Sequence, residues 1–170
     1  MQLTRAADYG VRVMVYLAAS HAEARISLPD LAAATSAPES FLSKVLQVLT
    51  RSGFISSRRG QSGGFAISSS GCAATMLDVI EAIDGKICLN TCLAPGACGR
   101  RHSCPAHPVW VDAQRAMLEV LRTATINALA QQSLIAGDSQ PLTQCSLPSA
   151  PQISPQLNSL CPDCVDAQGR

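Results

Sequence analysis

The sequence lacks two features that would place it in or across a membrane. No uninterrupted apolar run reaches the ~18–20 residues that a membrane span needs. The one apolar stretch near the start, 13–19, is too short for a signal peptide, and charged Asp8 and Arg12 lie just upstream of it. We therefore expect no membrane partner and a cytoplasmic location, where thiols stay reduced.

The sequence also lacks the small size that would make its eight cysteines a disulfide framework. A chain of 170 residues can bury one core and carry a smaller attachment without such bridges. No internal repeat is apparent, and the net charge is only +1. That small value hides an asymmetry, because residues 1–66 hold seven Lys/Arg against four Asp/Glu. This balance is a weak indication of a polyanionic partner for the front of the chain.

What the sequence does have is a dense group of metal-binding residue types between positions 88 and 107. Four cysteines and two histidines fall in this stretch, and three of the cysteines are evenly spaced as Cys92-x5-Cys98-x5-Cys104, with His107 three positions on. Glycines and prolines between them allow a short loop to curl and point several side chains inward. Thiolate and imidazole ligands suit zinc or iron–sulfur chemistry. A four-ligand site is therefore predicted in this loop.

The front third of the chain reads as three helices, over residues 3–22, 28–35 and 39–52. Ser27 can cap the second, with Asp30 at the capping-box position, and Gly53 can end the third. The third helix has an apolar face that includes Phe41, opposite small polar and basic side chains. Two helices joined by a tight turn at 36–38 are typical of a helix-turn-helix.

A basic, glycine-rich turn follows between two short β-prone pieces, within residues 54–67. This pattern predicts a hairpin with a longer loop. Beside a helix-turn-helix it indicates a wing, whose arginines can meet phosphates or enter a minor groove. The predicted fold class is therefore mainly α with a small β-hairpin, a winged helix-turn-helix.

The predicted DNA contacts lie on the polar face of the third helix and on the wing. Phosphates would be met by the basic side chains and base edges by the polar ones. The candidates are Ser40, Phe41, Ser43, Lys44, Gln47, Arg51, Arg58, Arg59, Gly60 and Gln61.

Residues 68–74 read as a linker, and further helices are expected over 75–84, 109–122 and 126–134. The 109–122 segment repeats apolar residues at Trp110, Ala113, Met117 and Leu121, with Val120 beside them. We expect this stripe to be core, dimer seam or both, because a two-fold homodimer is the commonest way to cover such a face.

The back of the chain, 138–170, is rich in proline, serine and glutamine and has no periodic apolar face, which predicts a disordered tail. The expected division is thus 1–68 for a winged helix-turn-helix, 69–137 for the cysteine loop and dimerisation helices, and 138–170 for the tail. The tail ends near Cys161-x2-Cys164, with Cys145 upstream.

These parts, in this order, resemble the winged-helix iron–sulfur transcriptional regulators of the IscR, NsrR and RirA group, over residues 1–134. The resemblance rests on Leu3-Thr4 followed by Asp8-Tyr9, on the helix-turn-helix, on Arg59-Gly60-x-x-Gly63-Gly64-Phe65, on residues 77–84, and on the triple cysteine. It implies a dimeric DNA-binding regulator, usually a repressor, whose DNA affinity depends on a cluster held by Cys92, Cys98 and Cys104. No catalytic residue is expected, and two-fold symmetry predicts a pseudo-palindromic DNA site.

The resemblance leaves two candidates for the fourth ligand. IscR-like members use a histidine that His107 matches, and NsrR-like members use an aspartate of the partner subunit that Asp8 matches. His107 is favoured because it is local to the loop. Three cysteines and a histidine would suggest a 2Fe–2S cluster, and Asp8 would point toward 4Fe–4S. Cys88 lies outside the even spacing and is a weaker ligand candidate.

Two other functions remain open from the sequence. Structural zinc would fill the same ligands and only hold the loop, with no sensing. An enzyme, a thiol–disulfide oxidoreductase, would use Cys161 and Cys164, although such a pair normally lies at a helix N-terminus in a βαβ fold.

Overall fold

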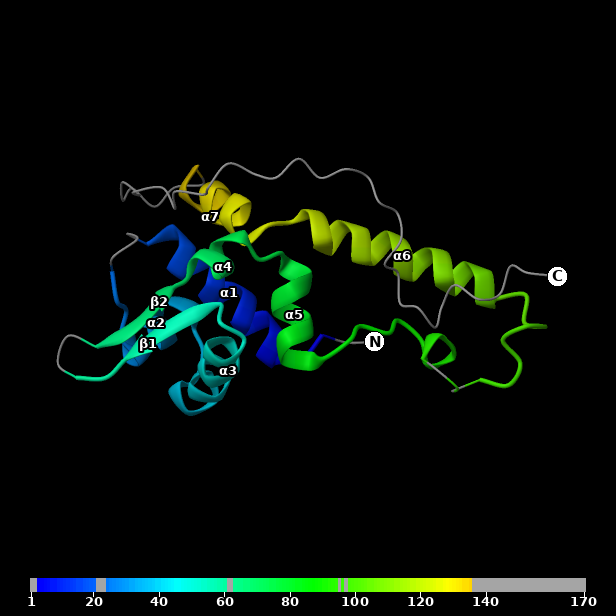
Figure 1. Ribbon diagram of the computed structural model, residues 1–170, viewed down its shortest axis with the longest axis horizontal. Helices are drawn as coiled ribbons and strands as arrows, with labels where there is room; N and C mark the ends of the chain where they lie inside the picture. Colours follow the sequence, from blue (N-terminus) through cyan, green and yellow to red (C-terminus); the bar gives the residue numbers. More distant parts are fainter. Residues whose placement is uncertain (1–2, 21–23, 61–62, 95, 97, 136–170) are drawn as a thin grey trace.

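A computed structural model describes residues 3–20, 24–60, 63–94, 96 and 98–135. The chain forms a packed head, from which a long helix and an extended loop project as an arm (Figure 1). We use "head" for α1–α4, β1, β2 and α7, and "arm" for residues 87–123; α5 joins the two. The elements are α1 (Arg5–Ala19), α2 (Leu28–Thr35), α3 (Glu39–Arg51), β1 (Ile55–Arg58), β2 (Gly64–Ile67), α4 (Ser69–Ala73), α5 (Met76–Asp84), the 3₁₀ turn η1 (Thr91–Leu93), α6 (His107–Thr123) and α7 (Ile126–Ile135).

The helix-turn-helix is confirmed as α2 and α3. The Ser27 hydroxyl caps α2 by accepting from the Asp30 amide at 3.3 Å. Ser36 ends α2 in a left-handed conformation, φ 55°. Gly53, at φ 76°, follows α3 as expected, because a glycine adopts this conformation without a Cβ clash.

The predicted boundaries of several helices are wrong by a few residues. α1 begins at Arg5, after the Thr4 cap, and ends at Ala19, because Ser20 is extended. α6 begins at His107, two residues earlier than expected, with Pro108 in its first turn. The expected linker 68–74 contains the short helix α4, whose first turn the Ser68 hydroxyl caps at 3.0 Å from the Gly71 amide.

The wing is an antiparallel hairpin in which Arg58 pairs with Gly64 and Ile55 with Ile67. A third segment joins it, since Ile26 and Phe65 exchange two backbone hydrogen bonds of 2.9 Å. A Cβ at Gly64 would lie 2.7 Å from the carbonyl oxygen of Ile26. The absence of a side chain at Gly64 therefore lets the segment before α2 pack directly against the wing.

Two apolar clusters hold the molecule together. The larger lies in the head, where α1, α2, α3 and α7 contribute side chains such as Met14, Leu31, Leu46 and Ile126, each 0% exposed. The smaller joins α1, α5 and the start of the arm through Ala7, Leu77, Ile80 and Ile87, and partly buried side chains of α6 pack against it.

The arm leaves and re-enters the head at one crossing point. The Met76 amide donates to the Ala124 carbonyl at 2.8 Å, and the Ile126 amide donates to the Ala74 carbonyl at 2.9 Å. The chain thus goes out through α5 and returns through α6 beside its point of departure. α7 then lies over α1 (Figure 1).

Within the described residues, no helix is both long enough and apolar enough to cross a membrane. The predicted tail, with Cys145, Cys161 and Cys164, lies outside the described residues, as does Gln61 of the wing.

Candidate nucleic-acid interface and cysteine loop

The outward face of α3 carries the polar side chains that are predicted to contact DNA. Ser40, Lys44, Gln47 and Arg51 are exposed and Ser43 is half-buried, while Leu42, Val45, Leu46 and Leu49 are buried on the opposite side. A helix that is fixed on one face by the core and polar on the other has the form needed to enter a major groove.

Phe41 departs from its expected place in the apolar face of α3. Its side chain is 38% exposed and stands edge-on to Tyr9 of α1, with ring centroids 5.8 Å apart. The Arg12 guanidinium lies 5.9 Å from the centroid of the Tyr9 ring and pairs with Asp8 at 2.8 Å. This row of side chains fixes Phe41 at the surface, where it remains a candidate for contact with DNA.

The wing presents its arginines to solvent beside α3. Arg58 and Arg59 are exposed, and Gly60 turns the chain at φ 112°. The structure brings one further basic side chain to this hairpin, that of Arg25. Its guanidinium donates to the Gly64 carbonyl at 3.4 Å. No local pattern in the sequence indicates this placement, because two helices separate Arg25 from the wing along the chain.

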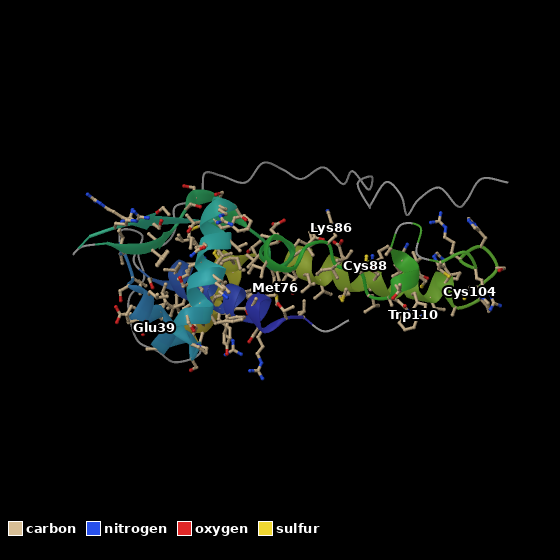
Figure 2. The ribbon with its side chains drawn as sticks, turned by 90° about the horizontal axis from the view of Figure 1, so that it is seen from below. Glu39, Met76, Lys86, Cys88, Cys104 and Trp110 are labelled. Atoms are coloured by element: carbon tan, nitrogen blue, oxygen red, sulfur yellow. The ribbon has the colours of Figure 1, made fainter. Side chains whose placement is uncertain are left out.

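The cysteine loop lies at the far end of the arm from the head. Figure 2 shows Glu39, at the start of α3, and Cys104 near opposite ends of the molecule, with Lys86 and Cys88 between them. Cys88, Cys92, Cys98 and Cys104 are all free and half-buried. His107 is half-buried at the start of α6, and its amide donates to the Cys104 carbonyl at 3.1 Å. Asp8 lies on α1 of the head, so the two proposed fourth ligands belong to different regions.

The residue types of the loop fit a thiolate-ligated metal centre, but their side chains lie apart. Reduced thiols and an imidazole are ligand types that iron–sulfur clusters and zinc accept. Among the described residues, however, no three His, Cys, Asp or Glu side chains lie together as a metal site requires. The structure therefore places Cys92, Cys98 and Cys104 on one loop, with His107 directly after it, but does not gather these side chains.

The base of the loop is anchored more firmly than its tip. Ile87 and Leu93 are buried, and the Leu89 amide donates to the Gln114 side chain of α6 at 2.8 Å. The span containing Cys98 and Cys104 consists of turns, and Arg100, His102 and Ser103 within it are exposed. The segment that carries Cys88 and Cys92 thus lies next to α6.

The family model described as "Rrf2: Iron-dependent Transcriptional regulator" matches residues 3–132. This chain belongs to the Rrf2 family. Protein aau3 of Rhizobium meliloti (strain 1021) is 33% identical over 131 residues, covering 76% of this chain and 84% of that protein. The HTH-type transcriptional regulator IscR of Klebsiella pneumoniae (strain 342) is 26% identical over 129 residues, covering 76% of this chain and 79% of IscR.

A solved structure extends the comparison to the fold. CymR, described as the global cysteine regulator of B. subtilis, superposes with a TM-score of 0.66 at 26% identity, covering 78% of this chain and 98% of CymR. The winged-helix fold of the Rrf2 family is thereby confirmed, and the chain is an Rrf2-family transcriptional regulator.

The Rrf2 chain exposes one face of α6 along its whole length. No residue of α6 is buried; Val109 is 66% exposed and Val120 is 68% exposed. The expected stripe is divided between two surfaces, because Met117 and Leu121 pack against the smaller cluster of this chain. Four of the exposed apolar residues form this face, Val109, Ala113, Ala116 and Val120, spaced by four, three and four residues. Trp110, which the sequence placed in the same stripe, is also exposed, at 39%.

Proposed function

We propose that this chain is a homodimeric transcriptional repressor whose affinity for its promoter depends on an iron–sulfur cluster in the cysteine loop. One observation carries the proposal: the polar face of α3 lies in the head, and four free thiols lie in the arm of the same Rrf2-family chain (Figure 2). The thiols and the polar face of α3 lie in different regions (Figure 2), so the arrangement suits a sensing site and a separate DNA-binding site.

The reading end would place α3 in a major groove and the wing on the neighbouring backbone. Ser40, Lys44 and Gln47 face outward for base edges, and Arg58 and Arg59 are positioned for phosphates or the minor groove. A dimer presents two such ends, so the DNA site would be pseudo-palindromic.

The dimer contact would form along α6. The row Val109, Ala113, Ala116 and Val120 lies on one face, and its two central alanines permit a second helix to approach closely. A two-fold contact uses the same row from both copies. This arrangement supplies the cover that these exposed apolar side chains lack within one chain.

The cluster would be held by Cys92, Cys98 and Cys104, with His107 favoured as the fourth ligand over Asp8 of a second copy. When bound, it would supply a redox- and nitric-oxide-reactive centre, and a histidine ligand raises its potential relative to thiolate alone. Of the four cysteines, only Cys88 falls outside the two five-residue spacings. The 2Fe–2S form is favoured with His107 as ligand.

Structural zinc is the second candidate, because the same thiolate and imidazole donors accept it. A zinc site would hold the loop in one state and would give DNA affinity no dependence on iron. The two proposals therefore differ in metal content and in colour.

The test is purification of the full chain without oxygen from iron-replete cells, followed by iron, sulfide and zinc analysis and a visible spectrum. DNA selected from a random library then serves as the probe for binding by the loaded and the iron-free protein. We expect iron with sulfide and a difference in affinity of about 5–150-fold between the two forms. Cys98→Ser should abolish iron binding, whereas the matched control Cys88→Ser should retain it. A colourless protein with zinc, or equal DNA affinity of both forms, contradicts the proposal.

A further inference from the structure

The last turn of α5 is fixed to the first turn of α1 by a carboxylate. Asp84 accepts from the Thr4 hydroxyl at 2.6 Å and from the Thr4 amide at 3.2 Å, although the two residues are 80 positions apart. The same hydroxyl accepts from the Ala7 amide at 3.2 Å and so caps α1. A single threonine therefore joins the start of α1 to the end of α5.

A second contact between these helices lies one residue earlier in α5. A Cβ atom at Gly10 would overlap the Cδ1 of Ile83, so Ile83 occupies the space that the glycine leaves. A Cβ atom at Gly10 would also lie 3.5 Å from the Cγ1 of Val45, a buried residue of α3. Ile83 of α5 and Val45 of α3 therefore both adjoin the space above Gly10, and α5 lies next to α3.

The other side of this turn leads directly into the cysteine loop. Gly85 ends α5 at φ 80°, and the Ile87 amide that follows donates to Glu81 at 3.5 Å. Ile87 is buried in the smaller cluster, and Cys88 comes next in the chain. In Figure 2, Lys86 and Cys88 lie where the arm begins.

We propose that Thr4, Gly10, Ile83 and Asp84, which we name the α1–α5 clasp, are positioning residues that transmit the state of the cysteine loop to α3. The inference rests on the proposed function. Any displacement of the loop that pulls on Gly85 must break the Asp84–Thr4 hydrogen bonds or slide Ile83 over Gly10. Packed interfaces of this kind move between discrete arrangements rather than deforming smoothly. The displacement therefore reaches Val45 and the helix that carries the DNA contacts.

The first experiment compares DNA affinity of iron-loaded and iron-free protein for Asp84→Ala and Thr4→Val. Removing the carboxylate or the hydroxyl should leave the iron content unchanged and shrink the loaded-to-free affinity ratio at least about threefold, within the usual range of coupling between sites. Thr4→Ser keeps both hydrogen bonds and should behave as wild type. Asp112→Ala is the matched control, because it removes an exposed carboxylate of α6 far from α1.

The outcomes separate the clasp from the proposed function. Suppose that the iron-loaded and iron-free wild-type proteins differ in DNA affinity. If both variants keep that difference in full, the clasp does not transmit the state of the loop and the inference is wrong. If the two forms of the wild-type protein bind DNA equally, the proposed function fails. The second experiment then tests by itself whether the clasp couples α1, α5 and Val45.

The second experiment needs no metal. Amide hydrogen exchange of iron-free Thr4→Val should accelerate in the first turn of α1, in the last turn of α5 and around Val45, whereas Asp112→Ala should change none of these. Acceleration confined to residues 4–7 would show only the absence of a helix cap and would overturn the inference.

Discussion

The head and the arm of this chain differ in how far they bury their side chains. In the head, helices α1, α2, α3 and α7 and the wing enclose side chains with no exposed area, and the buried Thr35 hydroxyl donates to the Leu31 carbonyl. In the arm, α6 buries no residue and the four cysteines of its loop are free. The head is thus complete within one chain, while the arm offers surfaces and ligands that something outside the chain would complete.

The difference in burial shows which region supplies most of the stability of the chain. Burial of about a dozen large apolar side chains gives the head a stability that does not depend on a ligand. The arm packs on the head side through Ile87, Met117 and Leu121, while α6 buries none of its residues.

The largest expected effect tests the packing of the head. Leu46→Ala removes a fully buried side chain and should lower the free energy of unfolding by about 2–5 kcal/mol, because apolar burial decreases and a cavity is left behind. Val120→Ala in the arm is the control and should change it by less than about 0.5 kcal/mol. Urea denaturation of protein diluted below its dimer dissociation constant measures both. Equal destabilisation by the two variants would mean that the two regions do not differ as described.

The next effect concerns the glycine between the helices. Gly10→Ala should destabilise the protein by about 0–2 kcal/mol, because the overlap of the new methyl group with the Cδ1 of Ile83 is partly offset by the higher helix propensity of alanine within α1. Ile83→Ala introduced with it should recover part of that stability, giving a coupling of about 1 kcal/mol in a double-mutant cycle. Additive effects in urea denaturation of the four proteins would contradict the contact.

Dimerisation through the arm comes third. Val120→Glu should raise the dimer dissociation constant at least about tenfold, because a two-fold contact places the change in both copies. Arg115→Gln, on a face of α6 away from the exposed row, is the matched control, because it also makes the charge more negative by one. Sedimentation velocity over a concentration series measures the dimer dissociation constant of each variant. An equal effect of both variants would mean that the exposed row of α6 does not form the dimer contact.

DNA binding by the head is tested by salt. Arg59→Ala should weaken DNA binding and lower the slope of log affinity against log salt by about 0.9 for each phosphate that the arginine neutralises. Arg122→Ala removes an exposed arginine of α6 and serves as the control. An unchanged slope in Arg59→Ala, measured by fluorescence anisotropy, would place the wing away from the DNA backbone.

The smallest effect sharpens the choice of fourth ligand. Asp8→Asn removes an exposed i,i+4 ion pair with Arg12 and should cost only about 0.3–0.5 kcal/mol of stability. If His107 is the ligand, Asp8→Asn should keep its iron while His107→Ala loses it or shows a shifted visible spectrum. The reverse pattern would assign the site to Asp8 of a second copy.

Local signals in the sequence determined much of the head. Ser27 and Gly53 bound their helices, and the glycine-rich turn after Arg59 predicts the wing, because caps and turns depend on a few neighbouring residues. The same holds for the candidate ligands, whose spacing needs no knowledge of the fold. The boundaries of α1 and α6 differ from the predicted ones by two or three residues, since helix ends depend on which groups are capped.

Only the tertiary structure decided which residues far apart in the sequence meet. It divided the apolar residues of α6 between the chain's own cluster and an exposed row, brought Arg25 to the wing, moved Phe41 onto Tyr9 and joined Asp84 to Thr4. Periodicity shows that a helix has an apolar side, but not which neighbour covers it. Contacts of that kind follow from the packing of the whole chain, and here they link the loop that carries the thiols to the helix that carries the predicted DNA contacts.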